Sequence, residues 1–347
     1  MHNKDQMVDV TKLITDVKNS KLNSSYSIAV RTEQLLENLI SHGKWNTAQE
    51  LMNLIKLRLK KIVDILPQEA TVNNIMRHAL KIIRDEYDAG FKSKGEGQST
   101  LHHLVTADAD TDSTDYSKYL QSLKIALLDH LAEYKVELEA SADNIASQAS
   151  EHIHSNEVIL TVGKSSTVEK FLKFGAKTRK YQIIVVESAP DYQGHAMAAS
   201  LAKSNIQTIV IPDSAVFAMM SRVNKVIIGT HTVMANGGLR AATGVHTVAL
   251  AAKHYSVPVM VLVHMYKLSP IHVCAYEQDT FNIFASPADV LPYSSGPVLN
   301  KVHVYNPIFD YVPPELVTLF ITHQGGNAPS YVYRLLSELY HPDDYYL

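Results

Sequence analysis

The chain has 347 residues, of which 46% are hydrophobic and 19% are charged. At roughly 150 residues per domain, this length predicts two domains, each able to bury its own core. The 32 Lys and Arg against 35 Asp and Glu give a net charge of −3, without the basic excess that is typical of a nucleic-acid-binding domain. We therefore expect no direct nucleic-acid partner.

Targeting and redox signals point to the cytosol. The longest apolar stretches, such as Val257–Met265, fall far short of the ~20 residues that cross a bilayer. The N-terminus is polar, and no apolar core of a signal peptide follows it. The single cysteine, Cys274, excludes an internal disulfide framework and a Cys-rich zinc site. These features predict a cytoplasmic protein without a membrane partner.

The N-terminal part of the chain has a helical pattern. Apolar residues recur at helical spacing over Trp45–Leu66, over Ala70–Tyr87 and from about Tyr116 to Ala149. Between the last two stretches, the composition at about 90–115 is acidic and rich in Gly and Ser, and it buries too little apolar area to fold. We predict a helical domain over residues 1–150 that contains a mobile loop there.

The pattern changes after His154, where short runs rich in β-branched residues alternate with helical stretches. Near-continuous apolar strands of this kind are typical of a parallel sheet covered on both faces. The predicted fold class is α/β, with the helical domain followed over residues 151–347 by a Rossmann-like, doubly wound, mainly parallel sheet. The predicted strands are Glu157–Val162, Gln182–Glu187, Thr208–Pro212, Lys225–Gly229 and Pro258–Val263, with a weaker one at Val302–Tyr305, and a final helix is predicted at Tyr331–Leu339.

Loops after such strands are where ligands bind, because the carboxyl ends of parallel strands meet at one edge of the sheet. The first loop, Val162–Ser166, resembles the end of a phosphate-binding P-loop, but the earlier glycine of that motif is replaced by Val158. This favours a tight strand-to-helix turn over a nucleotide site. A second loop, Gly229–Gly244, carries glycines that would let backbone N–H groups approach an anion. It does not match GxGxxG, so a packed glycine turn is favoured while a small-ligand pocket stays open.

Metal and cofactor chemistry find little support in the sequence. Among 17 histidines, His152 and His154 lie two residues apart, but no Asp, Glu or Cys follows at ligand spacing. Capping or interface roles are favoured for them, and no metal or cofactor is predicted. The region around Phe309–Tyr331 is dense in aromatic residues and prolines, which give rigid contact area. Whether this tail packs on its own sheet or on a partner stays open.

Four segments, 152–163, 223–244, 306–320 and 325–344, closely resemble the beta-subunit family of eukaryotic translation initiation factor 2B. The likeness continues more loosely into the helical part. It implies a subunit of the complex that exchanges GDP for GTP on initiation factor 2. In that family the exchange chemistry belongs to the gamma and epsilon subunits, while alpha, beta and delta form a regulatory core.

The resemblance therefore implies a non-catalytic scaffold and sensor. Its expected partners are the homologous delta subunit, paired through the C-terminal domains, the alpha, gamma and epsilon subunits, and initiation factor 2, including its phosphorylated alpha subunit. The segment 152–156 matches a region near the symmetric interface of the family's core. The candidate interface residues are His154, Asn156, Phe309, Tyr311 and Tyr331.

The regulatory fold is also similar to that of isomerases acting on methylthioribose 1-phosphate and ribose 1,5-bisphosphate, which supplies the alternative function. Their cysteine falls on Gly163 and their acid/base aspartate on His231. Their arginine falls on Ala189, and their Asn-Lys pair on Ala241 and Ala242. A lone histidine base without an acid partner or a phosphate clamp would achieve little. The resemblance thus implies a degenerate sugar-phosphate pocket without catalytic residues, formed by Gly163, Lys164, Ala189, His231, Asn236, Gly237 and Gly244, whose glycines still leave room for an anion.

Overall fold

The computed structural model describes residues 7–19, 21–22, 24–94, 115–272 and 282–345. Their contacts divide the chain into two compact units, Met1–Leu138 with Leu339–Leu347, and Glu139–Glu338. The division lies at 138/139, inside a helix, whereas the sequence places it at 150/151. Of the loop expected at about 90–115, residues 95–114 lie outside the described part, and residues 90–94 continue a helix.

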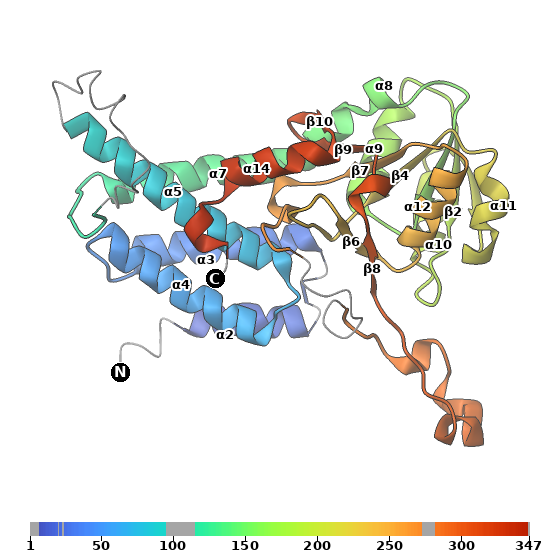
Figure 1. The fold of residues 1–347 in the computed structure, drawn as a ribbon, viewed down its shortest axis with the longest axis horizontal. Helices are drawn as coiled ribbons and strands as arrows, with labels where there is room; N and C mark the ends of the chain where they lie inside the picture. Colours follow the sequence, from blue (N-terminus) through green and yellow to red (C-terminus); the bar gives the residue numbers. More distant parts are fainter. Residues whose placement is uncertain (1–6, 20, 23, 95–114, 273–281, 346–347) are drawn as a thin grey trace. The chain divides into compact units, whose positions relative to one another are not determined.

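The first unit is helical (Figure 1). Ser24 begins its second helix with a capping box, in which Ser24 and Ser27 satisfy each other's backbone N–H groups. The Thr47 side chain caps the next helix by accepting from the Glu50 N–H. The helices are α2 (Val8–Lys18), α3 (Ser25–His42), α4 (Ala48–Ile65), α5 (Ala70–Lys94) and the first part of α7 (Leu123–Ser147). Three of them, α4, α5 and α7, confirm the helical periodicity found in the sequence.

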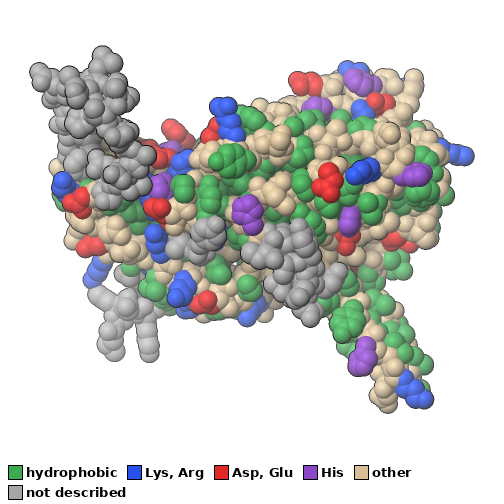
Figure 2. Space-filling view, viewed as in Figure 1, with side chains coloured by type: hydrophobic (Ala, Val, Ile, Leu, Met, Phe, Trp, Pro, Cys, Tyr) green, Lys and Arg blue, Asp and Glu red, His purple; other side chains and the backbone are tan. Residues whose placement is uncertain are grey.

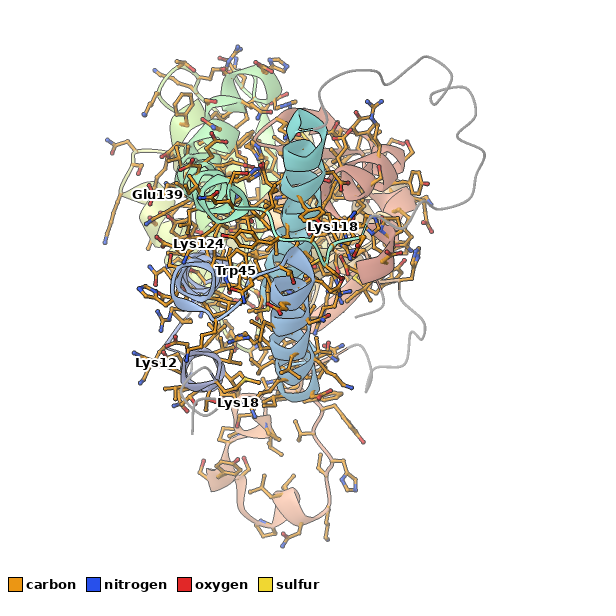
Figure 3. All side chains as sticks on the ribbon, turned by 90° about the vertical axis from the view of Figure 1, so that its left-hand side faces the viewer. Lys12, Lys18, Trp45, Lys118, Lys124 and Glu139 are labelled. Carbon is orange, nitrogen blue, oxygen red and sulfur yellow. The ribbon has the colours of Figure 1, made fainter. Side chains whose placement is uncertain are left out.

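Two side chains satisfy carbonyl groups at the end of α3, where a helix leaves its last carbonyls without partners. The Trp45 indole N–H donates to the Ile40 carbonyl at 3.2 Å, and the Lys124 ammonium donates to the Ser41 carbonyl at 2.8 Å (Figure 3). The α3–α4 turn and the start of α7 are thereby attached to one helix end.

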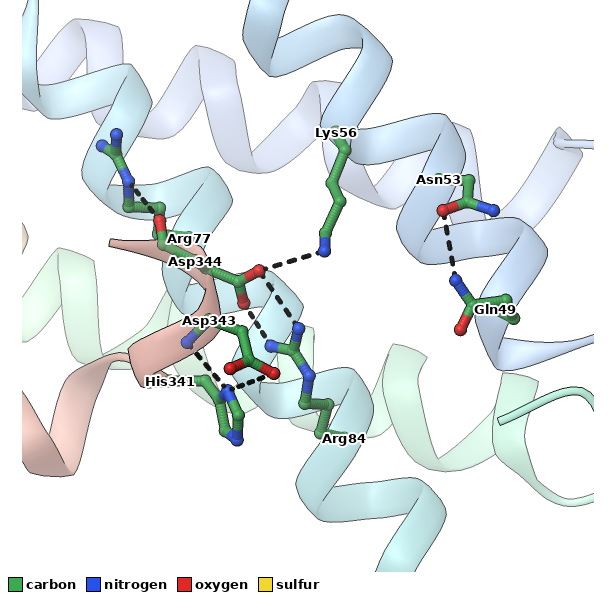
Figure 4. A network of polar contacts seen from close by, with 8 residues as sticks. All are labelled: Gln49, Asn53, Lys56, Arg77, Arg84, His341, Asp343 and Asp344. Carbon is green, nitrogen blue, oxygen red and sulfur yellow. Dashed lines mark hydrogen bonds and ion pairs between the residues drawn. The ribbon is translucent and has the colours of Figure 1, made fainter. Parts of the chain in front are cut away.

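The C-terminal tail completes the helical unit, because Asp344 is buried among basic side chains (Figure 4). Its carboxylate forms a two-pronged ion pair with Arg84, and Lys56 Nζ lies 3.3 Å from it. The Asp344 backbone carbonyl accepts from Arg77 Nε at 3.0 Å. The His78 ring donates from Nδ1 to the Leu339 carbonyl at 2.9 Å. These contacts join α4 and α5 to residues more than 250 positions away in the sequence.

The second unit contains a doubly wound sheet, which confirms the predicted fold class. Within the described residues its strand order is β10-β9-β7-β4-β1-β2-β3, and all neighbours are parallel except β10, which runs antiparallel to β9. The order reverses between β1 and β4, which is where ligands bind in such sheets. The strands are β1 (Val158–Val162), β2 (Gln182–Val186), β3 (Gln207–Ile211), β4 (Lys225–Gly229), β7 (Val259–Leu262), β9 (Leu319–Thr322) and β10 (Gly325–Asn327).

Helices α9 (Ser166–Gly175) and α10 (Gln193–Ala202) pack on one face of this sheet. Phe171 and Met197 from these helices join Ile183 and Val185 of β2 in a fully buried core. The other α-helices in the described part of this unit are the end of α7, α8 (Ala149–His152), α11 (Val216–Met220), α12 (Val245–His254) and α14 (Val332–Leu339). No helix in the described ranges is long and apolar enough to span a membrane.

A small antiparallel sheet was not predicted. The glycine-rich stretch contains β5 (Thr232–Val233) and β6 (Leu239–Ala242), and β6 pairs with β8 (Phe309–Val312). The strand predicted at Val302–Tyr305 is wrong, because this segment has no partner strand and the side chains of Val302 and Tyr305 are exposed.

Candidate functional site

The turn after β1 is closed by the chain itself. Gly163 has a positive φ of 56°, which favours glycine, and its N–H donates to the Val186 carbonyl at 3.1 Å. Lys164 is exposed. Ser165 caps α9, and a Cβ on Gly229 would lie 2.7 Å from the Ser165 hydroxyl oxygen. The end of β4 therefore approaches Ser165 directly at the point where the strand order reverses.

A carboxylate lies at the ends of β2 and β3. Asp213 accepts a hydrogen bond from the Ala189 N–H at 2.8 Å through Oδ2. Its Oδ1 lies 3.8 Å from the position that a Cβ on Gly244 would take. Asp213 thus brings together Ala189 and Gly244, two residues of the predicted pocket. A phosphate placed between them would face a negative charge rather than the arginine of the isomerases.

A second carboxylate occupies the start of α12. Gly244 has a φ of 95°, and the N–H groups of Gly244 and His246 donate to Asp310 Oδ2 at 2.7 and 3.2 Å. Helix N-termini bind anions through such N–H groups. Because Asp310 of β8 already accepts from them, these two donors are engaged within the chain, and Gly244 offers an anion less than its sequence context suggested.

His231 is held in its neutral form. Its Nδ1 lies 2.9 Å from the Thr232 hydroxyl, and its ring contacts the Phe309 ring at a centroid distance of 4.8 Å. Burial, and then the positive charges of Lys267 and Arg240, lower the pKa of His231 to about 3. At neutral pH this imidazole lacks the second ring proton of an imidazolium, and its low pKa makes it a weak base.

The nearby cations contact groups of the same unit. Lys267 Nζ donates to the Thr230 carbonyl at 2.8 Å. The Arg240 guanidinium lies 4.2 Å from the centre of the Phe309 ring, in a cation–π contact. Phe309, a predicted interface residue, is therefore buried between His231 and Arg240.

The glycine-containing turn between β5 and β6 is packed against β8. Asn236 Oδ1 accepts from the Gly238 N–H at 2.9 Å, and Asn236 Nδ2 donates to the Tyr311 hydroxyl at 2.8 Å. A Cβ on Gly238 would lie 2.7 Å from the Tyr311 ring, and one on Gly237 would lie 3.0 Å from the Pro329 carbonyl. These contacts give the packed turn that the sequence favoured over a ligand pocket.

The other predicted interface residues are dispersed. His154 and Asn156 are exposed before β1, at the amino end of this strand, whereas the pocket residues follow carboxyl ends. Tyr331 is 38% exposed just before α14. Sequence reasoning missed Asp213, although it directly follows a strand end, and it missed Asp310, for which no local signal exists. In the described part of the chain, no three His, Cys, Asp or Glu residues are grouped to hold a metal ion.

Comparison with known proteins places these features in a family. The sequence profile of the Initiation factor 2 subunit family matches residues 21–329. The translation initiation factor eIF2B subunit beta of Dictyostelium discoideum is 43% identical over 95% of both chains. The same subunit of Schizosaccharomyces pombe is 34% identical over 96% of both. The ribose 1,5-bisphosphate isomerase of Pyrococcus furiosus is 25% identical over 95% of this chain and 94% of its own.

Solved structures share the fold. The crystal structure of eIF2B beta from Chaetomium thermophilum superposes with a TM-score of 0.72 at 24% identity, covering 97% of this chain and 92% of that one. A chain of the tetrameric eIF2B-beta2-delta2 complex from the same organism also gives 0.72 at 24%, covering 95% and 94%. The delta subunit from that organism gives 0.63 at 16%, covering 91% and 97%.

Proposed function

Because the chain belongs to the initiation factor 2 subunit family, as an eIF2B beta subunit, we propose that it is a regulatory, non-catalytic part of the guanine-nucleotide exchange complex that acts on initiation factor 2. It forms the core of this complex with the delta subunit and helps to sense phosphorylation of the alpha subunit of initiation factor 2. It works in the cytosol without a cofactor of its own, and the alpha, gamma and epsilon subunits are its further partners.

The observation that carries the proposal is the extent of the likeness to the Dictyostelium beta subunit, 43% identity over 95% of both chains. Likeness over nearly the whole length supports the same role as a subunit, rather than the sharing of one domain alone. The tetramer of beta and delta chains from Chaetomium supports delta as the partner.

The carboxyl edge of the sheet is, on this proposal, the remnant of a sugar-phosphate pocket. Gly163 and Ala189 lack the reactive groups that isomerisation needs, and His231 is neutral. Asp213 and Asp310 accept hydrogen bonds from backbone N–H groups beside the space where a phosphate would lie. The isomerase alternative would require a substrate phosphate to bind next to these carboxylates without a cationic clamp.

Co-expression with a tagged delta subunit of the same organism tests the proposal. We expect the two chains to co-purify and native mass measurement to give a complex with equal numbers of each. The reconstituted exchange factor should lose its response to phosphorylated initiation factor 2 when this chain is left out. A chain that ignores the delta subunit and instead turns over ribose 1,5-bisphosphate would establish the alternative.

A further inference from the structure

A hollow in the helical unit lies beside the turn between α3 and α4. It has a volume of about 760 Å³, within the range of roughly 300–1,000 Å³ that is usual for binding pockets. Its apolar lining consists of Trp45, Leu54 and Leu57, and the Leu57 side chain is 54% exposed. Polar side chains, including Lys44 and Asn53, complete the wall. We call this hollow the Trp45 pocket.

The wall of the Trp45 pocket is fixed by contacts within the helical unit. The Trp45 indole N–H donates to the Ile40 carbonyl, which holds the ring at the end of α3. Glu50 Oε2 accepts from a backbone N–H of the turn before α4 at 2.8 Å, and Gln49 Nε2 donates to Asn53 Oδ1 at 3.2 Å (Figure 4). Because these side chains are already ordered, an occupant loses less free energy to immobilising them.

The chain re-enters the described part of the helical unit beside this pocket. Residues 95–114 lie outside the described ranges. Where the chain resumes, the Tyr116 carbonyl accepts from the Gln49 N–H in the first turn of α4 at 3.1 Å. The Tyr87 hydroxyl of α5 donates to the Asp115 carbonyl at 2.7 Å. The point at which the chain resumes is therefore fixed between α5 and the helix that forms much of the pocket.

The pocket is within reach of the intervening chain from both of its ends. Leu57, at the far end of the pocket, lies about 12 Å along α4 from the first turn of that helix. About ten residues separate Val105 from Asp115, and an extended chain of that length spans up to ~35 Å. At the other end, α5 finishes at Lys94, about 10 Å beyond Tyr87 along the helix.

The sequence of residues 95–114 contains an apolar run that suits the pocket. Its large apolar residues are Leu101, Leu104 and Val105, and their spacing of i, i+3 and i+4 would place them on one face of a helical turn. By itself such a segment buries too little apolar area to offset the entropy of the chain. A preformed apolar pocket supplies the contact area that the segment lacks.

The charge of residues 95–114 also suits the surroundings of the pocket. Apart from two histidines, the ionisable side chains of this segment are the carboxylates of Glu96, Asp108, Asp110 and Asp112. Basic and acidic side chains are interspersed on the face of the helical unit that Figure 2 shows. At the pocket, Lys44 is part of the wall, Lys118 and Lys124 lie on the same side (Figure 3), and Glu50 already accepts a backbone N–H. Such exposed charges add little affinity, but they favour an acidic occupant over a basic one.

We propose that the Trp45 pocket receives residues 101–105 of the same chain, whose apolar face packs on Trp45 and Leu57. The contact lies within one chain and does not depend on the proposed function. The covalent link raises the effective concentration of the segment to about the millimolar range, which favours it over the same sequence on another molecule. The contact would attach the long connection between α5 and α7 to the start of α4.

Trp45 is the only tryptophan of the chain, so its fluorescence reports on the pocket directly. In the full-length double variant Leu101→Asp and Leu104→Asp, the emission should shift to longer wavelength. Quenching by acrylamide should increase about twofold, because the large ring loses its cover on one side. The double variant Thr111→Asp and Ser113→Asp is the matched control, since it adds the same charges to the same segment without removing an apolar side chain. It should match the wild type, and circular dichroism establishes that each variant is folded.

Limited proteolysis with chymotrypsin tests the contact from the side of the pocket. Cleavage after Leu101 and Leu104, followed by mass spectrometry, should be slow in the wild type. Leu57→Asp should accelerate it about tenfold, because the segment then spends more time away from the pocket. Val8→Asp is the control, since Val8 is 58% exposed on α2, outside the pocket, and it should leave the rate unchanged.

Two results would overturn the proposal. One is identical Trp45 fluorescence in the wild type and in the Leu101 and Leu104 double variant, and the other is equally fast cleavage in the wild type and in Leu57→Asp. Hydrogen exchange of residues 43–57 identifies a different occupant. Protection of these residues only after the purified delta subunit is added would overturn the proposal in favour of a partner subunit.

Discussion

The two units use buried and half-buried carboxylates in opposite ways. In the helical unit, Asp344 joins side chains of two helices to the distant C-terminal tail. In the α/β unit, Asp213 and Asp310 accept hydrogen bonds from backbone N–H groups of neighbouring loops. A buried charge is tolerated only when it is paired. Pairing of the buried Asp344 thus joins distant segments of the helical unit, whereas the half-buried Asp213 and Asp310 join neighbouring loops of the α/β unit.

The electrostatics of the helical unit follow from this pairing. Burial by itself would lower the pKa of Arg84, but the hydrogen bonds and the charge of Asp344 raise it above its ordinary value. Burial lowers the pKa of Arg77, partly offset by Tyr340 and Asp344. Both guanidinium groups stay charged, so the positive charge on α5 depends on Asp344 for compensation.

The largest expected effect concerns this pairing. Asp344→Ala leaves the buried Arg84 without its carboxylate partner, and the free energy of unfolding should fall by about 3–5 kcal/mol. The measurement is denaturant unfolding followed by circular dichroism. Asp343→Ala is the matched control, because the neighbouring carboxylate is 72% exposed, and it should change little. Similar losses in the two variants would contradict the central role of Asp344 and weaken the contrast between the units.

The closed edge of the α/β unit is tested by Gly229→Ala. The added methyl group would lie 2.7 Å from the Ser165 hydroxyl oxygen, and overpacking of this kind costs about 1–3 kcal/mol. Thermal unfolding should show the loss, and adding Ser165→Gly should recover part of it because the two effects are coupled. Gly326→Ala, whose methyl group would meet only the flexible Leu319 side chain at 3.3 Å, should cost less. A stable Gly229→Ala variant would show that the edge is open.

The free energy of unfolding should depend on pH through His264. His264 is buried between the Ser141 and Thr167 hydroxyls, at 3.0 and 2.9 Å. Burial, followed by the charges of Lys267, His323 and Lys170, lowers its pKa to about 3.

Because the unfolded chain binds this proton near pH 6.5, the stabilisation from neutral His264 is complete above that pH. It is lost as pH falls towards 3, by about 1.4 kcal/mol per pH unit. The variant His264→Gln should flatten the dependence of the unfolding free energy on pH between 6 and 4, as measured by urea titration. His303→Gln, which removes an exposed histidine, is the control variant. An unchanged slope in His264→Gln would show that this histidine does not titrate with folding.

The last prediction is that two substitutions in the predicted pocket create no isomerase activity. Gly163→Cys combined with His231→Asp restores a thiol and a carboxylate, yet we expect no turnover of ribose 1,5-bisphosphate above a blank. Neither change supplies a cation, and Asp213 and Asp310 still occupy the edge. The assay is product formation by the folded double variant, with the Pyrococcus isomerase as the positive control. Measurable turnover would mean that the pocket is less degenerate than its carboxylates suggest.

Sequence patterns anticipated the elements whose signals are local. Runs of β-branched residues predicted both ends of β1, β2, β3, β4 and β7 to within one residue, because buried parallel strands need continuous apolar side chains. The same composition misled at Val302–Tyr305, where no neighbouring strand is available. Strands β5 and β6 are only two and four residues long, and β6 pairs with β8 across some seventy residues.

Of the candidate site, the sequence predicted only which catalytic side chains are absent. The absent cysteine, arginine and aspartate are visible as Gly163, Ala189 and His231, because the resemblance assigns each position. The carboxylates that lie near these positions are not visible in the same way. Asp310 accepts from residues 64 and 66 positions away, and no periodicity or motif reports a contact of that kind.

The docked tail also sets the order in which the helical unit can be completed during synthesis. Arg84 and Asp344 are 260 residues apart, so at about 5–20 residues per second the ribosome delivers the acidic partner roughly 10–50 s after the basic one. For that interval Arg84 of α5 lacks the carboxylate with which it pairs in the folded unit. Helix α5 therefore emerges well before the tail that completes its packing, and the helical unit reaches its final form only after the α/β unit has been synthesised.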